Sequence, residues 1–137
     1  MHLTQIRLIV DDLAGTAEFY RTVVGLEPQV ADPAPPYIAF KPALGSSLCL
    51  HERGDLDAML GELLRPGRGD TAMVSLRVDD LTGYLDEITA RGAEIAAGPV
   101  VFGDRIRCAY LRDPEGNLVE IQQWLTTRSG EPVPPAS

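Results

Sequence analysis

The sequence predicts an α+β fold made of two tandem βαβββ modules, and three observations predict it. The stretch L-I-V-D-D-L, which begins at Leu8, recurs 68 positions later as L-R-V-D-D-L from Leu76. In both copies an alternating apolar pattern leads into an apolar stripe at helical spacing that ends at a glycine. Short extended segments follow each glycine. A repeat half the chain long exceeds a solenoid unit and fits a duplicated half-domain.

The first strand and the helix of each module have matching signals. The alternating strand face is formed by Ile6, Leu8 and Val10 in the first copy and by Val74, Leu76 and Val78 in the second. Asp12 and Asp80 stand where a helix N-cap is expected. The apolar stripes of the two helices are Leu13, Ala17, Tyr20 and Val24, then Leu81, Leu85 and Ile88. Gly25 and Gly92 are expected to end the helices.

The remaining strands are expected at 28–30, 37–40 and 47–52 in the first module and at 94–95, 105–111 and 117–124 in the second. The residues D-P-E-G from Asp113 predict a tight turn between the last two strands. The modules then cover about 3–52 and 71–125 of one domain, 1–125. The connector 53–70 is expected to hold a short helix over 55–64, capped by Asp55 and ended before Pro66. Residues 126–137, which contain three prolines, are expected to form a flexible tail.

Composition narrows the possible partners. Twenty acidic against twelve basic residues give a net charge of −8, which disfavours a nucleic-acid partner. No apolar run approaches the roughly 18 residues of a membrane span, and the first ten residues lack the pattern of a signal peptide. We therefore expect a cytoplasmic protein without a membrane partner. Cys49 and Cys108 lie in strand-like segments and are expected to be buried, reduced thiols.

The V-D-D-L strand-to-helix turns and the run D-P-E-G-N-L-V-E from Asp113 resemble the vicinal oxygen chelate superfamily of glyoxalases, bleomycin resistance proteins and extradiol dioxygenases. The resemblance covers about residues 3–125. It implies that the two modules curve their mixed sheets around one cavity, often completed by a second subunit, so a homodimer is expected. In metal-dependent members of the superfamily, side chains on the cavity faces of the strands hold a divalent ion.

The resemblance also locates the equivalents of the metal ligands. They are Gln5 in the first strand, Met73 at the same place in the second module, and Glu120 after the D-P-E-G turn. Alignment of 47–51 with 117–121 puts Leu50 at the remaining position, and a slip of one or two residues would bring His51 or Glu52 there. An amide, a thioether and one carboxylate are a poor donor set for a divalent ion. The metal therefore stays open: none is the first expectation and a divalent ion is the alternative.

Glu120 is the candidate catalytic residue. It shares strand parity with Leu118, Gln122 and Trp124, opposite Val119 and Ile121, so it is expected to face the cavity. An inward carboxylate is costly unless it is paired, which makes it a site candidate. The structural alternative is an ion pair with an arginine: Arg7, Arg105 or Arg107. The residues expected to contact a ligand are Gln5, Leu50, His51, Met73, Tyr110, Gln122 and Trp124. His51, which ends a strand, is expected to be exposed.

Three functions remain open. The first is a protein that binds a small organic molecule, a natural product or drug, without metal, as bleomycin resistance proteins do. The second is a metal-dependent lyase, isomerase or dioxygenase in which Glu120 acts as general base or metal ligand. The third is an interaction module that has kept the fold and lost the pocket.

Overall fold

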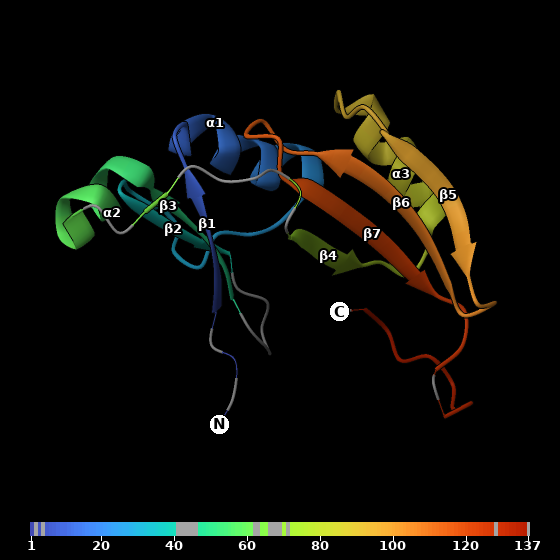
Figure 1. Cartoon of the computed structure of the whole chain (residues 1–137). Coiled ribbons are helices and arrows are strands. Elements are labelled where there is room, and N and C mark those ends of the chain that lie inside the picture. The colour runs from blue at the N-terminus through green and yellow to red at the C-terminus, as the bar shows by residue number, and fades with distance from the viewer. Residues whose placement is uncertain are drawn as a thin grey trace. The chain divides into compact units, whose positions relative to one another are not determined.

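The computed structural model describes residues 1, 3, 5–40, 47–61, 64–65, 70, 72–127 and 129–136. Its contacts divide the chain into two compact units, Met1–Arg68 and Gly69–Ser137. Each unit contains one copy of the sequence repeat and one mixed β-sheet with a helix on one face (Figure 1). The predicted α+β class, with two mixed sheets, is confirmed.

The first module contains β1 (Gln5–Val10), β2 (Tyr37–Phe40) and β3 (Ser47–Glu52), in the sheet order β1-β3-β2. Strand β1 runs parallel to β3, whereas β2 is antiparallel to β3. The strand predicted at 28–30 is wrong, because the structure has only an isolated bridge from Pro28 to Phe40 there. Proline has no N–H to donate to a ladder, and further prolines follow in this loop, at 33, 35 and 36.

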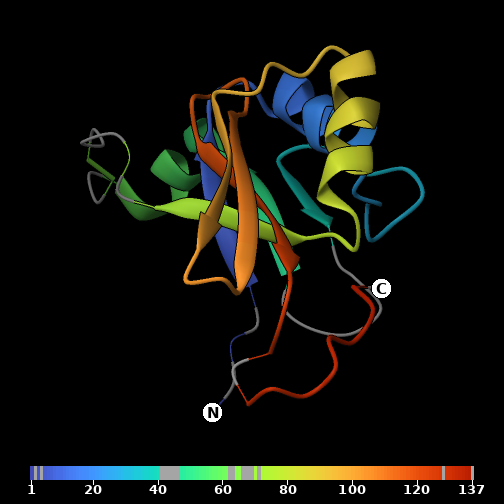
Figure 2. The same cartoon turned by 90° about the vertical axis from the view of Figure 1, so that its right-hand side faces the viewer.

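The second module contains β4 (Met73–Arg77), β5 (Ala97–Phe102), β6 (Ile106–Arg112) and β7 (Leu118–Trp124), in the order β4-β7-β6-β5. Helix α3 (Leu81–Ala90) lies across one face of this sheet (Figure 2). The strand predicted at 94–95 begins later, at Ala97. The chain is still turned against the end of α3 at Ala93, whose N–H donates to the carbonyl of Ile88 at 2.9 Å.

The helix signals in the two copies are confirmed. The carboxylate of Asp12 accepts from the Gly15 N–H at the start of α1 (Leu13–Glu18), and Asp80 accepts from the Gly83 N–H at the start of α3. After α1 the first helix continues as a π-helix, η1 (Phe19–Val24), and ends at Gly25 with φ 97°. Such a left-handed conformation favours glycine.

The connector helix begins earlier than predicted. Helix α2 (Arg53–Leu60) starts directly after β3, with Glu52 at its N-cap. Asp55 is therefore not the cap; it lies in the first turn and its carboxylate bonds to His51. The helix ends at Leu60, before Gly61, and Pro66 lies outside the described residues.

Each module buries the sheet face that its helix covers. The buried apolar residues of the first module include Val10, Leu13, Tyr20, Val24, Ile38, Phe40 and Leu50, and those of the second include Leu81, Leu85, Ile88, Ala109, Leu111, Val119 and Ile121. Ala17, predicted on the first helix stripe, is only half-buried, and Thr16 is buried instead. In the described part of the chain, no helix has the length and apolarity to cross a membrane.

The turn at Asp113 is confirmed. Its carboxylate accepts from the N–H groups of Glu115 and Asn117, at 2.9 and 2.8 Å, which connects β6 to β7. Beyond β7 the chain turns back toward β4 (Figure 1). There Arg77 donates to the carbonyls of Pro134 and Pro135, at 2.8 and 2.7 Å. The flexibility expected of residues 126–137 stays a prediction.

Candidate functional site

In each module the sheet face away from the helix carries a polar cluster. In the second module the cluster centres on Glu120 in β7. The strand register pairs Glu120 with Ser75 of β4 on one side and with Tyr110 of β6 on the other. Since directly paired residues share a face, the three polar side chains lie together. The neighbours of Glu120 along β7, Val119 and Ile121, are fully buried on the opposite face.

Both carboxylate oxygens of Glu120 accept hydrogen bonds. The Tyr110 hydroxyl donates to Oε2 at 2.6 Å, and the Ser75 hydroxyl donates to Oε1 at 2.9 Å. The Gln122 side-chain amide donates to Oε1 at 2.6 Å, and the Cys108 thiol also bonds to the carboxylate. Glu120 is only 9% exposed. The side chain is therefore buried in a shell of neutral donors.

This shell sets the protonation of the cluster. Burial raises the pKa of Glu120, but the hydrogen bonds from Tyr110, Gln122, Ser75 and Cys108 lower it by more, so the net shift is downward. The hydrogen bond to Glu120, together with burial, raises the pKa of the Tyr110 hydroxyl well above its usual range. Burial and the nearby Glu120 carboxylate raise the pKa of the Cys108 thiol. At neutral pH the cluster is one carboxylate surrounded by protonated donors.

No arginine of the described residues forms an ion pair with this carboxylate. Among the described residues Glu120 takes part in no ion pair, so the ion pairs expected with Arg105 or Arg107 are not formed. Arg7, the third expected partner, bonds within its own module. Neutral donors, and not the arginine of the structural alternative, satisfy the charge of Glu120 within the described residues.

A small pocket of about 280 Å³ adjoins the Glu120 cluster. Its lining includes Arg105, Ile106, Gln122 and Trp124. Gln122 joins the two features, because its amide nitrogen donates to Glu120 and its oxygen accepts from the indole N–H of Trp124 at 3.1 Å. Trp124 is 38% exposed, and its ring centroid lies 4.4 Å from the guanidinium carbon of Arg77. The buried Nε–H of Arg105 has no hydrogen-bond partner within the described residues.

The polar cluster of the first module is formed by Gln5, Arg7, Tyr37 and Cys49. The Gln5 amide nitrogen donates to the Tyr37 hydroxyl at 2.8 Å, and its oxygen accepts from Nη2 and Nε of Arg7 at 2.8 and 2.9 Å; this amide orientation pairs every donor with an acceptor. The Tyr37 hydroxyl also lies 2.8 Å from the Cys49 sulfur. Burial and the Cys49 thiol raise the pKa of Tyr37. Gln5 is thus fully engaged by protein groups.

His51 belongs to the same face and is buried, at 6% exposure, so the expectation of an exposed ring is wrong. The reason is that α2 follows β3 directly and brings Asp55 over the ring. The Asp55 carboxylate lies 2.6 Å from Nε2, and Nη1 of Arg7 lies 3.2 Å from Nδ1. Because a guanidinium can only donate, Nδ1 accepts and Nε2 donates to Asp55. Both ring nitrogens are occupied.

The alignment that put Leu50 at the position equivalent to Glu120 is corrected by one residue. Ser75 pairs with Glu120, and Arg7, 68 positions before Ser75, pairs with Cys49. Cys49 is therefore the equivalent of Glu120, whereas Leu50 is fully buried on the helix face. Met73, which occupies in the second module the position of Gln5 in the first, begins β4 and is 49% exposed.

Two groups of expected site residues are thus brought together, one in each module: Glu120 with Tyr110, Gln122 and Trp124, and Gln5 with His51 through Arg7. The sequence interpretation missed Ser75 and Cys108 as partners of Glu120, and Asp55 as the partner of His51. Ser75 had a usable signal, because it lies two residues after Met73 and side chains two apart share a strand face. Asp55 had none, because its role depends on where α2 begins.

The donors present do not fit a divalent ion. The Gln5 oxygen already accepts from a guanidinium, whose positive charge would repel a cation. Both oxygens of Glu120 are engaged, and Met73 offers only a thioether. Among the described residues, no three His, Cys, Asp or Glu side chains are grouped so that they could hold a metal. We therefore derive no chemistry through a metal at these positions.

The family model of the Glyoxalase/Bleomycin resistance protein/Dioxygenase superfamily matches residues 2–121. The chain belongs to this superfamily. Among curated proteins, the uncharacterized protein YraH of Bacillus subtilis is 28% identical to this chain over 132 residues, which span 91% of this chain and all of YraH.

Solved structures agree with the superfamily fold. A glyoxalase/bleomycin resistance protein/dioxygenase from Nocardioides is 25% identical with a TM-score of 0.74, covering 98% of this chain and 89% of that one. TnmS3, an antibiotic binding protein from Streptomyces sp. CB03234, is 23% identical with a TM-score of 0.69, covering 90% of this chain and 96% of its own. At 23% identity, the similarity to TnmS3 shows a shared fold.

Proposed function

We propose that this protein binds a small planar organic molecule, a natural product or drug, and does so without a metal. The observation that carries the proposal is the Glu120 cluster, in which four protein donors satisfy a carboxylate that metal-dependent relatives would leave for an ion. A general base that works at neutral pH is favoured by a raised pKa. The lowered pKa of Glu120 therefore supports a structural and binding role over proton abstraction.

The ligand class follows from the pocket beside Glu120. Trp124 offers a partly exposed ring for stacking. Arg105 lines the same pocket, and its buried Nε–H has no hydrogen-bond partner within the described residues, which is costly for a buried donor. A ligand that places a carbonyl oxygen there would remove this cost. We propose a planar aromatic ligand with a ring carbonyl, held in a cytoplasmic homodimer that protects the cell by sequestration, in line with the antibiotic binding of TnmS3.

The ligand can be tested with xanthone and xanthene, two tricyclic probes that differ in the ring carbonyl. Trp124 is the single tryptophan, so its fluorescence reports on this pocket. We expect saturable quenching by xanthone, unchanged by EDTA, and weaker quenching by xanthene. Arg105→Met should reduce the preference for xanthone, whereas Arg91→Met, on the exposed end of α3, should not. Equal response to both probes in the native protein would contradict the proposed Arg105 contact.

The metal question is tested separately, by thermal unfolding with added nickel, zinc, manganese and iron(II). We expect no metal-dependent rise in the melting temperature. A rise that Glu120→Ala abolishes would favour the competing hypothesis of a lyase, isomerase or dioxygenase, because an ion that binds only the folded state stabilises it.

A further inference from the structure

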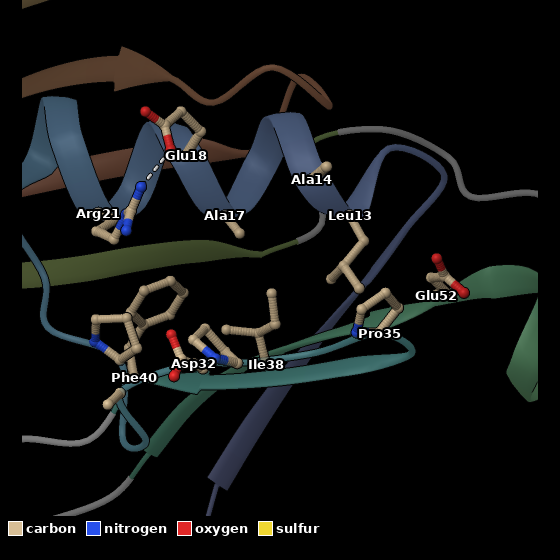
Figure 3. A pocket seen from close by; sticks show the side chains of 13 residues that line it. Leu13, Ala14, Ala17, Glu18, Arg21, Asp32, Pro35, Ile38, Phe40 and Glu52 are labelled. Atoms are coloured by element: carbon tan, nitrogen blue, oxygen red, sulfur yellow. Dashed lines mark hydrogen bonds and ion pairs between the residues drawn. The ribbon is translucent and has the colours of Figure 1, made fainter.

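A second pocket lies in the first module. It is on the helix side of the sheet, opposite the face that carries the polar cluster of Gln5 and His51. This helix-side pocket lies between α1 and the edge strand β2, with the loop 28–36 as its outer wall (Figure 3). Its volume is about 410 Å³. Pockets that bind small molecules span roughly 300–1,000 Å³, so the space suffices for a ligand.

One substitution between the repeats accounts for part of this space. Helices α1 and α3 start in the same register, because Asp12 and Asp80 cap them in the same way. In that register Ala17 corresponds to Leu85. Leu85 is buried against the second sheet, whereas Ala17 is half-buried and lines the pocket. The first module therefore lacks the side-chain volume that fills the same position in the second.

The loop 28–36, which stands where the second module has a strand, also contributes to the space of the pocket. In the second module β5 pairs with β6 along the sheet edge, but in the first a single bridge, at Pro28, is followed by a loop. Backbone hydrogen bonds hold both ends of this loop: the Gln29 N–H donates to Ala39 at 2.8 Å, and the Glu52 N–H donates to Pro36 at 2.9 Å. The prolines of this loop restrict its backbone angles further, so the loop loses little conformational entropy when a ligand binds. The pocket is preformed.

The chemistry of the lining is apolar with an acidic rim. Leu13, Ala17, Ile38 and Phe40 supply the apolar surface. At one end Glu18 pairs with Arg21 at 2.9 Å, and Glu52 lies toward the other end (Figure 3).

Two rim carboxylates have no cation. Within the described residues neither Asp32 nor Glu52 takes part in an ion pair, and both line the pocket. The rim thus offers negative charge to a ligand, while the walls offer apolar contact.

We propose that the helix-side pocket is a separate binding site for a small amphipathic amine, with one aromatic or branched aliphatic body and one protonated nitrogen. The apolar body packs between Ala17, Ile38 and Phe40. Asp32, beside Phe40, and Glu52, beyond Leu13, lie at opposite ends of this body (Figure 3), so the nitrogen lies toward one of these two carboxylates. This site is independent of the pocket at Trp124, and it uses only residues of the first module.

The experiment is an amide NMR titration of the full chain with three probes that share one ring: 2-phenylethylamine, 2-phenylethanol and phenylacetate. We expect 2-phenylethylamine to give saturable shifts at the amides of Ala17, Ile38 and Phe40. The two rim carboxylates, an exposed one at Asp32 and a half-buried one at Glu52, should favour the cation over the anion by about fivefold at low salt, and less at high salt.

Two variants separate the walls from the rim. Ala17→Leu, which restores the residue of the second module, should abolish these shifts, and Ala58→Leu on the exposed face of α2 is the matched control that should keep them. The double substitution Asp32→Asn with Glu52→Gln should equalise the cation and the anion while 2-phenylethanol still binds. It keeps the volume of the pocket lining, and the Glu52 side chain makes no capping hydrogen bond to α2, so the double variant stays informative if Ala17→Leu folds poorly.

Three results would overturn the proposal: no saturable shifts at these amides, binding that survives in a folded Ala17→Leu variant, or equal binding of 2-phenylethylamine and phenylacetate by the native chain. Shifts confined to Gln122 and Trp124 would assign the probe to the pocket at Trp124 and would refute a site under α1 in the same way as the first result. Failure of xanthone to bind would leave the amine site unaffected, so the two proposals are distinguished.

Discussion

At Glu120 a buried negative charge is stabilised by hydroxyl, thiol and amide donors instead of by a cation. Hydrogen bonds to a charged group are stronger than those between neutral groups. Such an arrangement orients the carboxylate rigidly and keeps it ionised. It also leaves the four donors dependent on one acceptor, so a change at Glu120 affects several side chains at once.

Glu120→Gln is expected to lower the free energy of unfolding at neutral pH by about 1–3 kcal/mol, because an amide leaves some buried donors without an acceptor. The native pKa of Glu120 is below its ordinary value of 4.5. The charge therefore stabilises the fold fully above that value, and the contribution is lost as the pH falls through the lowered native pKa. Urea unfolding of both proteins should show the difference shrinking under acid.

The control for this prediction is Glu94→Gln, at an exposed carboxylate. It should unfold like the native chain at neutral pH. A Glu120→Gln protein that is as stable as the Glu94→Gln protein at every pH would contradict the role assigned to the cluster.

Residue-scale prediction from the sequence succeeded where a local pattern decides the geometry. Alternation along one strand indicated that Glu120 and Gln122 share a face, and the recognisable turn before that strand located it. The face that Tyr110 shares with them follows from the register of β6 on β7. Ser75 comes from a strand 45 positions earlier, and its pairing with Glu120 depends on parallel register. Leu50 shows the opposite problem, since an alignment error of one residue moves a side chain to the other face of a sheet.

Among the elements, α1 and α3 show how a short motif fixes a boundary. Each begins with an aspartate whose carboxylate accepts from the N–H of a glycine three residues later. A Cβ at Gly15 would collide with the Asp12 carboxylate, and one at Gly83 would also lie too close to the Asp80 carboxylate. In each helix, the capping aspartate therefore needs a residue without a side chain three positions later. The repeated motif supplies this glycine in both copies, and it predicted both helix starts correctly.

Asp12→Ala and Asp80→Ala are each expected to cost about 1 kcal/mol of stability, because each removes an acceptor from a helix N-terminus. Chemical denaturation followed by circular dichroism measures both. Asp86→Ala, at an exposed position within α3, should change stability by less than about 0.5 kcal/mol. Equal losses in all three variants would show that the caps contribute nothing specific.

The missing strand of the first module could not be predicted from its residues alone. Residues 28–30 follow a glycine stop just as a strand would, and only the lack of a pairing partner beyond Pro28 distinguishes them. Pairing depends on the position of β2, which no local pattern supplies. The same limit applies to β5, whose start is set by the path of the chain after Gly92.

The C-terminal segment offers a prediction about order. Arg77 donates to two carbonyls of this segment, and the N–H of Ala136 donates to Asp79 at 2.8 Å. Arg77→Ala should therefore increase the fast backbone motion of residues 131–136, as measured by the heteronuclear NOE. Arg21→Ala, at an exposed arginine of the first helix, should not. Low NOE values for these residues in the native chain would instead favour the fully flexible tail expected from the sequence.

For the molecule as a whole, the homodimer expected from the superfamily can be tested at β5. This edge strand exposes Val100, Val101 and Phe102, an unusual concentration of apolar surface. We expect the native chain to sediment as a dimer and Phe102→Glu to shift it toward monomer. Val30→Glu, at an equally exposed apolar residue in a loop, is the control that should stay dimeric. A native chain that sediments as a monomer would contradict the prediction.

The difference between the two modules has a consequence for how this chain can change over generations. The second module keeps four strands and a filled helix face, whereas the first has a loop in place of one strand and an alanine in place of Leu85. A duplicated gene segment lets one copy retain folding strength while the other drifts. We therefore expect inherited variation to accumulate at 28–36 and to be purged at 97–102, so that new specificities arise in the first module while the second preserves the ancestral architecture.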